Sequence, residues 1–323
     1  MSDSQVHEID HTRLKTIVDG IAAEIGNSKE WGKAADYIPE LAKVDTKQFG
    51  IAVLTRDGQT IAAGDADKQF SIQSISKVFA LSLALEAKGE KVWKRVGKEP
   101  SGDPYNSIID LERHKGIPRN PFINPGALVI VDMLLDARKG DAIPDTVRDF
   151  IAEMIGEEKI GIDEDVVKSE HTSGYTNKAL ANLAKSFDNL KHGVDDVMHV
   201  YVRQCAVALS CRQLAAAGKF LMLDREDIDG KVAKADAERA RRINSIMLTC
   251  GQYDGSGDFA YRVGLPAKSG VGGGILAIVP NTASVAVWSP GLDENGNSLL
   301  GTLALERLSK RMDWSIFGAI RSV

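Results

Sequence analysis

The chain has 323 residues, of which 43% are hydrophobic and 26% are charged, a composition typical of a globular protein rather than a disordered one. Its 40 Lys and Arg against 45 Asp and Glu give a net charge of −5, which argues against a nucleic-acid partner because such proteins carry a basic excess. The three cysteines and six histidines form no CxxC, HExxH or HxH pattern, so the sequence disfavours a disulfide scaffold and a metal site.

The first thirty residues carry charged side chains throughout, with no apolar core of signal-peptide length. No apolar run in the chain approaches the ~20 residues of a membrane span. We therefore expect a cytoplasmic protein with no membrane partner.

Both ends of the chain predict a helix and a β-hairpin. Apolar residues at helical spacing or a helix-like composition indicate the helices, and β-rich runs separated by turn residues indicate the hairpins. The predicted helices cover residues 12–25 and 298–312, and the predicted hairpins pair 49–55 with 60–63 and 274–279 with 283–288.

From about residue 70 to residue 250 the apolar pattern is almost wholly helical. The clearest predicted helices are 145–155, 177–190, 194–210 and 235–249, and a proline-rich stretch, 97–125, is expected to wrap the surface or rim a site. We expect one α+β domain over 1–323, with an antiparallel sheet built from both chain ends. Its sheet lobe would span about 1–69 and 255–323, and its inserted helical lobe about 70–254.

A central helix is predicted to begin near Phe70 and to end at Gly89, and it is apolar on nearly all sides over 78–85. Ser74 and Lys77 would share one face of it, with Cβ atoms ~5–6 Å apart. The helix dipole favours a developing alkoxide on Ser74, and an uncharged Lys77 would accept its proton. Because SxxK arises by chance about 1.6 times in this composition, a capping serine followed by a solvated lysine is the alternative.

A second motif, Lys268-Ser269-Gly270, precedes a glycine run and a predicted strand. Beside Ser74, Lys268 would be a second cation that lowers the pKa of Lys77, and the Val271 amide would be an oxyanion donor. A phosphate cradle is one alternative, although no GxxxxGK[ST] is present, and a glycine-rich bulge at a sheet edge is another.

Several polar residues occupy turns or helix starts, among them Asn124, Asn177 and Tyr253, and ordinary caps and turns explain each by itself. The sequence contains no GxSxG motif and no recognisable cysteine nucleophile. Hydrolases with a nucleophile elbow and cysteine amidases are therefore disfavoured.

The combination of SxxK, Tyr175-x-Asn177 and Lys-Ser-Gly resembles the arrangement of β-lactamases and penicillin-binding proteins. A closer resemblance covers almost the whole chain, since an ordered series of blocks is similar to the serine-dependent glutaminase family. The blocks are Tyr37-Ile-Pro-Glu-Leu-Ala-Lys43, Phe70-Ser-Ile-Gln-Ser-Ile-Ser-Lys77, Asn120-Pro-Phe-Ile-Asn-Pro-Gly-Ala127, Ser169-Glu170 with Asn177, Tyr201-x-x-Gln-Cys205, Cys250-Gly-Gln-Tyr-Asp254, Gly264-Leu-Pro-Ala-Lys-Ser-Gly-Val-Gly-Gly-Gly-Ile275, Trp288-Ser-Pro-x-Leu-Asp293 and Gly296-Asn-Ser298.

The resemblance implies a β-lactamase-like fold and the hydrolysis of L-glutamine to L-glutamate and ammonia, without a metal or organic cofactor. It implies that Ser74 is the nucleophile, that Lys77 is its base and that Tyr253 relays protons, with the choice between Lys77 and Tyr253 as acylating base left open. The amides of Ser74 and Val271 would form the oxyanion hole. The implied glutamine-binding residues are Ser74, Asn124, Glu170, Asn177, Tyr201, Tyr253 and Val271, with Tyr37 at the rim. Members of the family are homo-oligomers, commonly dimers or tetramers.

The charges of glutamine agree with the implied binding residues. Free glutamine is a zwitterion, so a selective site needs an anion near the ammonium, which Glu170 supplies, and neutral donors near the carboxylate. Two other functions stay open as alternatives: a penicillin-interacting serine transferase, and a non-catalytic protein that binds an amino acid. Ammonia release from glutamine distinguishes the first hypothesis from both.

Overall fold

The computed structural model describes residues 9–137, 144–157, 160–222 and 231–318. Residues 1–8, which belong to the stretch predicted to lack a signal peptide, and residues 319–323, at the end of the predicted 1–323 domain, lie outside the described residues. Within the described ranges, no helix combines the length and the apolar character that crossing a bilayer requires.

A five-stranded antiparallel sheet in the order β2-β1-β8-β7-β6 is assembled from the two ends of the chain. The pairing of β1 with β8, which sets Gly50 opposite Trp288, brings the ends together, and both predicted hairpins are confirmed. Strands β1, β7 and β8 are buried at every residue, as expected for a sheet covered on both faces. The strands are β1 (Gly50–Thr55), β2 (Thr60–Gly64), β6 (Ala267–Ser269), β7 (Gly274–Val279) and β8 (Ala283–Trp288).

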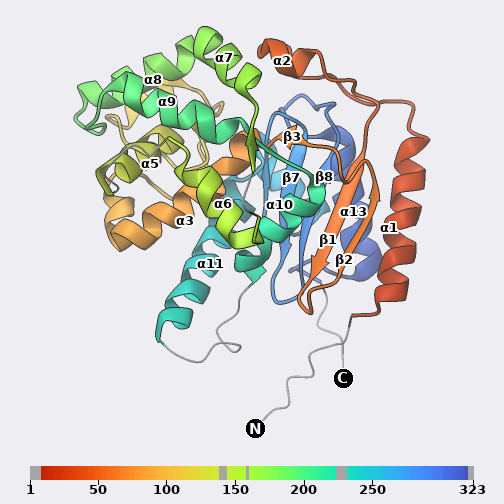
Figure 1. The fold of residues 1–323 in the computed structure, drawn as a ribbon. Helices are drawn as coiled ribbons and strands as arrows, with labels where there is room; N and C mark the ends of the chain where they lie inside the picture. Colours follow the sequence, from red (N-terminus) through yellow and green to blue (C-terminus); the bar gives the residue numbers. More distant parts are fainter. Residues whose placement is uncertain (1–8, 138–143, 158–159, 223–230, 319–323) are drawn as a thin grey trace.

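Helices α1 (His11–Gly26) and α13 (Leu299–Met312) pack together over one face of this sheet, at the right of Figure 1. Each begins at a side-chain cap, since Asp10 accepts from the Arg13 amide and Ser298 accepts from the Gly301 amide. Both helices predicted at the chain ends are thus confirmed, and so is the fold class, an antiparallel sheet built from both ends with helices inserted between them.

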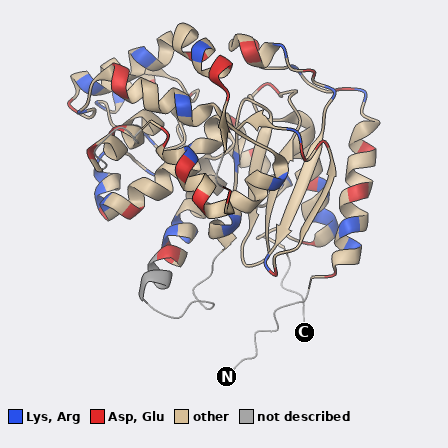
Figure 2. Cartoon of the chain, in the orientation of Figure 1, with Lys and Arg blue, Asp and Glu red and all other residues tan. Residues whose placement is uncertain are grey.

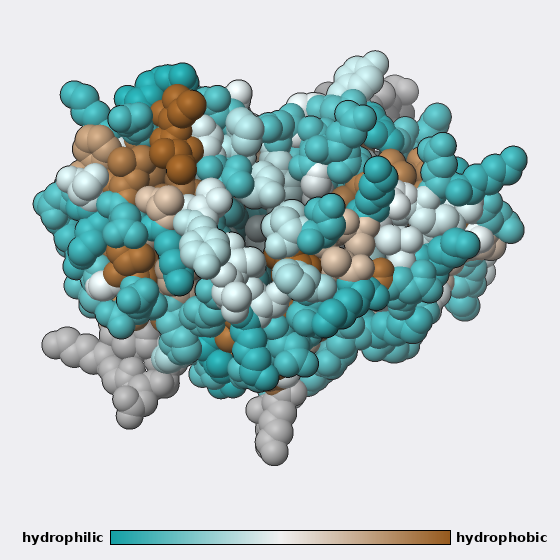
Figure 3. Space-filling model, turned by 90° about the horizontal axis from the view of Figure 1, so that it is seen from above, coloured by the Kyte–Doolittle hydropathy of each residue, from teal (hydrophilic) through white to brown (hydrophobic). Residues whose placement is uncertain are grey.

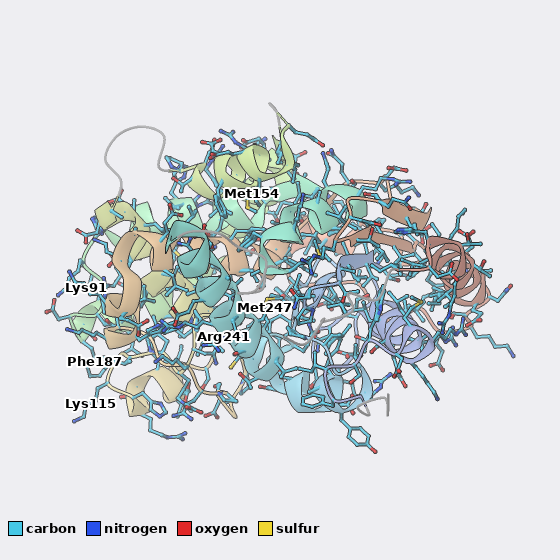
Figure 4. The ribbon with its side chains drawn as sticks, turned by 90° about the horizontal axis from the view of Figure 1, so that it is seen from below. Lys91, Lys115, Met154, Phe187, Arg241 and Met247 are labelled. Carbon is cyan, nitrogen blue, oxygen red and sulfur yellow. The ribbon has the colours of Figure 1, made fainter. Side chains whose placement is uncertain are left out.

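Helix α12 packs with α1 and α13, whereas most of the other helices lie on the opposite side of the sheet around α3, whose residues are buried from Ser76 to Leu85. Helix α11 packs against α3, and Figure 4 shows it from below with the buried Met247 and the exposed Arg241 labelled. The helices are α2 (Pro39–Ala42), α3 (Ser76–Lys88), α4 (Ile108–Arg113), α5 (Asn124–Ala137), α6 (Thr146–Ile155), α7 (Glu164–Ser173), α8 (Tyr175–Ser186), α9 (Val194–Cys205), α10 (Cys211–Ala217), α11 (Lys231–Cys250) and α12 (Ser256–Arg262).

The expectation of an almost wholly helical middle is wrong at one place, where a second antiparallel sheet forms in the order β3-β5-β4. Its strands are β3 (Phe70–Ser71), β4 (Gly161–Ile162) and β5 (Val207–Leu209). The predicted helix from Phe70 therefore begins at Ser76, and the one predicted to run to residue 210 ends at Cys205. Short apolar runs read alike as buried strand or buried helix, so periodicity alone does not separate them.

The outer surface carries charges of both signs. Figure 2 shows Lys and Arg interspersed with Asp and Glu along the helices, with no face of a single sign in that view. Seen from above in Figure 3, the surface is mostly hydrophilic, and hydrophobic side chains gather at the left, over the helical part of the molecule. This mixture agrees with the small net charge of the chain.

Candidate active site

Ser74 lies in a single 3-10 turn, Gln73–Ile75, between strand β3 and the first residue of α3. Gln73 has a φ of 49°, a left-handed conformation that is uncommon for residues other than glycine and often found at functional sites. The turn after β6 approaches this segment closely, since a Cβ at Gly270 would stand 2.5 Å from the Ile72 carbonyl oxygen. The serine hydroxyl is thus held near the positive end of the α3 dipole.

The Ser74 side chain lies within hydrogen-bonding reach of the Tyr253 phenol. Tyr253 sits in another 3-10 turn with a φ of 51°, and its hydroxyl donates to the Ser269 carbonyl at 3.5 Å. Burial raises the pKa of Tyr253 above its usual range, although the hydrogen bond with Ser74 acts in the opposite direction. The phenol therefore stays protonated at neutral pH and can donate a proton as well as hold the serine.

Lys77 lies in the first turn of α3 and is only 1% exposed. Its Nζ donates to Asn124 Oδ1 at 2.6 Å and to the Phe122 carbonyl at 3.2 Å, and burial lowers its pKa to about 8. In the described part of the chain, its hydrogen bonds go to these two oxygens and not to Ser74. The structure thus brings Ser74 together with Tyr253, while the direct pairing of Ser74 with Lys77 stays a prediction.

Lys268, on strand β6, is fully buried beside Tyr253. Its Nζ donates to the Ser269 carbonyl at 2.6 Å and to the Gly251 carbonyl at 3.1 Å, and it lies 4.4 Å from the centre of the Tyr253 ring. Burial, and then the charge of Lys77, lower the pKa of Lys268 well below its usual range. Burial is the largest cause of the lowered pKa of both lysines, and the effect of Lys268 on the pKa of Lys77 stays a prediction.

A set of polar side chains from the helices faces the same region. Asn124 Nδ2 donates to Asn177 Oδ1 at 2.9 Å, and the Tyr201 hydroxyl donates to Asn124 Oδ1 at 3.4 Å. Glu170, on α7, is 7% exposed, and its Oε1 is buried without a hydrogen-bond partner among the described residues. Burial raises the pKa of Glu170 to about 7, against a hydrogen bond from Gln73 and the charge of Lys77.

Tyr37 and Val271 complete the predicted set. Tyr37 is 53% exposed, and its hydroxyl accepts from the Tyr105 hydroxyl at 3.4 Å. The Tyr105 ring packs against the Tyr253 ring at a tilt of 40°, with ring centres 4.7 Å apart. Val271 is buried in the turn between β6 and β7 and belongs to one apolar cluster with Tyr253.

Four residues at the site were not singled out by the sequence: Gln73, Tyr105, Phe122 and Ser269. Gln73, Phe122 and Ser269 lie inside quoted motifs, which was the available signal, although Phe122 contributes its carbonyl rather than its side chain. Tyr105 lies in the irregular stretch 97–125. Among the described residues, no group of three or more His, Cys, Asp or Glu side chains is arranged to hold a metal ion. The arrangement offers a hydroxyl, a phenol, two buried amines and one buried carboxylate.

Comparisons with known proteins agree on one family. Residues 32–317 match the family model described as Glutaminase. The chain is 55% identical to a glutaminase of Azorhizobium caulinodans over 305 residues, which is 94% of this chain and 99% of that protein. A solved structure described as "Probable glutaminase ybaS" superposes with a TM-score of 0.88 at 35% identity, covering 96% of this chain and 100% of that one. The structure of Mglu in its glutamate form superposes with a TM-score of 0.85 at 33% identity, covering 95% of this chain and 70% of that one.

Proposed function

The chain belongs to the serine-dependent glutaminase family, and on that premise we propose that Ser74 is the nucleophile of a covalent mechanism. The enzyme is a hydrolase that acts on the amide of glutamine. In the proposed mechanism Ser74 Oγ attacks the side-chain carbonyl carbon, the C–N bond breaks, and ammonia leaves a glutamyl ester that water hydrolyses to glutamate. The observation that carries this proposal is the placement of the buried Ser74 within reach of the Tyr253 phenol, together with the buried amines of Lys77 and Lys268.

Lys77 is proposed as the base that accepts the Ser74 proton. A neutral amine has two N–H bonds and one lone pair, and Asn124 Oδ1 and the Phe122 carbonyl accept both N–H bonds. The lone pair therefore remains for the serine proton, and a pKa of about 8 keeps a fraction of Lys77 uncharged at neutral pH. Tyr253, which is protonated, would pass its proton to the departing ammonia and regain one from the Lys77 ammonium, so that the serine proton ends on the ammonia.

Two groups of contacts would hold the substrate. Glu170 Oε1, which has no hydrogen-bond partner in the part of the chain that the structure describes, supports a role as acceptor for the glutamine ammonium. The neutral polar groups are offered by Asn124, Asn177, Tyr201 and Tyr37. The amides of Ser74 and Val271 are proposed as the oxyanion hole, which would stabilise the charge that develops on the carbonyl oxygen without a metal or organic cofactor.

The nucleophile is tested by measuring ammonia release from glutamine with Ser74→Ala. We expect a loss of about 10³-fold or more in kcat, because no other hydroxyl occupies that place. Ser82→Ala is the matched control, since Ser82 is also buried but lies on α3, about two helical turns further along the chain. Intact-protein mass spectrometry during turnover should detect the glutamyl adduct only when Ser74 is present.

Undiminished turnover by Ser74→Ala would contradict the assignment. Covalent labelling of the parent protein by a penicillin, without glutamine turnover, would favour the serine transferase alternative instead.

The assembly and the compartment belong to this proposal as well. We propose a homo-oligomer, a dimer or a tetramer, and support comes from exposed apolar side chains on and next to α4. Ile109 on α4 is 66% exposed, Ile117 is 45% exposed, and the neighbouring Gly116 lies against Phe187. A cytoplasmic location is proposed because the three cysteines are free and buried, which fits a reducing compartment.

A further inference from the structure

The loop 293–297, between β8 and α13, forms a tight turn at the back of Tyr253. The Asp293 side chain accepts from the amides of Asn295 and Asn297, both at 2.9 Å, and the Asp293 amide donates to the Asn297 carbonyl at 2.8 Å. A Cβ at Gly296 would lie 3.9 Å from Tyr253 Cε2, so the loop passes close to the phenol ring. The turn therefore fixes the backbone of Asn297 beside the ring.

The Asn297 side chain is 4% exposed and makes a hydrogen bond with each end of its amide. Its Nδ2 donates to the Gln252 carbonyl at 3.0 Å, and its Oδ1 accepts from Ser269 Oγ at 2.6 Å. A carbonyl can only accept, so the contact with Gln252 determines which end of the amide points where. One buried amide thus bridges two segments that are otherwise separate in the sequence.

Both partners of Asn297 hold Tyr253. Gln252 is the residue directly before Tyr253, whose φ of 51° is a left-handed conformation that the surroundings must maintain. The Ser269 carbonyl accepts a hydrogen bond from the Tyr253 hydroxyl at 3.5 Å and another from Lys268 Nζ at 2.6 Å. Asn297 consequently ties the strained turn behind the phenol to the strand that holds its hydroxyl.

We propose that Asn297 is a positioning residue that orients the phenol of Tyr253 towards Ser74. The inference rests on the proposed role of Tyr253 in proton transfer. Asn297 touches neither Ser74 nor the reacting atoms, so its effect must pass through Tyr253. Loss of the amide should leave the protein folded and lower kcat, because the phenol would no longer be held where the serine needs it.

The test is a double-mutant cycle of Asn297→Ala with Tyr253→Phe, with kcat measured by ammonia release. We expect Asn297→Ala to lower kcat about 10-fold or more in the parent and less than about 2-fold in Tyr253→Phe, where no hydroxyl remains to be placed. A purely structural contribution would lower kcat by the same factor in both backgrounds. Asn295→Ala is the matched control, because Asn295 lies in the same turn but is exposed.

Equal losses in the two backgrounds, or no loss in the parent, would overturn the proposal. If Tyr253→Phe alone keeps the parent kcat, the proposed function of Tyr253 fails first, and the inference about Asn297 fails with it. Circular dichroism and thermal unfolding check that each variant is folded. Should Asn297→Ala not fold, Ser269→Ala takes its place in the cycle, because it removes only the hydroxyl that donates to the Asn297 amide.

Discussion

Lys77 and Glu170 are oppositely charged in water, but burial shifts both towards their neutral forms. Burial lowers the pKa of Lys77 to about 8 and raises the pKa of Glu170 to about 7. Each shift is consistent with a proposed role. A lysine that acts as a base must first lose its proton, and a carboxyl group with a pKa near 7 is stabilised in its ionised form when an ammonium ion binds beside it. The two groups moderate each other, because each charge favours ionisation of the other.

These shifts predict a pH profile with a rising limb. In the free enzyme both Lys77 and Glu170 must be deprotonated for catalysis and binding, so kcat/KM should increase from about pH 6 to about pH 9 and level off above the two pKa values. Glu170→Gln should raise KM and remove the lower of the two inflections, while Glu164→Gln, at the exposed start of the same helix, should keep both. A profile that is flat across this range would contradict the proposed base.

At the scale of elements, the turn 120–124 delivers the two acceptors of Lys77. Asn120 Oδ1 accepts from the amides of Phe122 and Ile123 at 2.9 and 3.1 Å, which shapes the turn before α5. Gly126 lies directly against the Asn120 carbonyl, so the first turn of α5 packs on this turn. The geometry around the lysine therefore depends on a helix start as much as on the side chains themselves.

Gly126→Ala should disturb this contact because a Cβ at that position would overlap the Asn120 carbonyl oxygen. We expect a loss of about 1–3 kcal/mol in the free energy of unfolding, measured by urea denaturation, together with a lower kcat as Lys77 loses its acceptors. Gly26→Ala is the matched control, since nothing lies within 4 Å of its Cβ position at the end of α1. An unchanged stability and kcat in Gly126→Ala would show that the turn can move at little cost.

At the scale of the whole molecule, the site gathers residues from segments that are distant along the chain. Ser74 follows the small sheet, Lys268 lies on the edge strand of the large sheet, and Glu170 comes from α7. The pairing of β1 with β8 joins both chain ends, so the parts that carry these residues are held by one framework. Apolar side chains left exposed on the outside, such as Ile109, remain available for contacts between copies.

The proposed oligomer predicts that a charge at this surface weakens it. Ile109→Lys should shift the sedimentation coefficient in analytical ultracentrifugation towards a smaller species, because a desolvated lysine is unfavourable in an apolar interface. Tyr261→Lys is the control, as Tyr261 is 91% exposed on α12, away from α4. A parent protein that sediments as a monomer would contradict the proposed assembly, and an unchanged oligomer in Ile109→Lys would place its interface elsewhere.

The sequence by itself determined the local elements and the set of candidate residues. Apolar periodicity and turn residues predicted both hairpins and the terminal helices, since these patterns depend on which side of one element faces the core. The ordered blocks predicted the family, because many weak motifs in one order are specific together. What lay beyond the sequence were the small sheet around Phe70, the start of α3 at Ser76, and the pairing of Ser74 with Tyr253.

Only the tertiary structure decided these features, and the reason is physical. A strand of two residues is stabilised by its partner across the sheet, so nothing in its own sequence distinguishes it from a helix start. The hydrogen bonds that join Asn297 to Gln252 and Ser269 cross 45 and 28 residues of chain, and packing of the whole fold brings their atoms together. The apolar periodicity of a segment shows which of its side chains are buried, whereas its strand and hydrogen-bond partners depend on how all segments pack together.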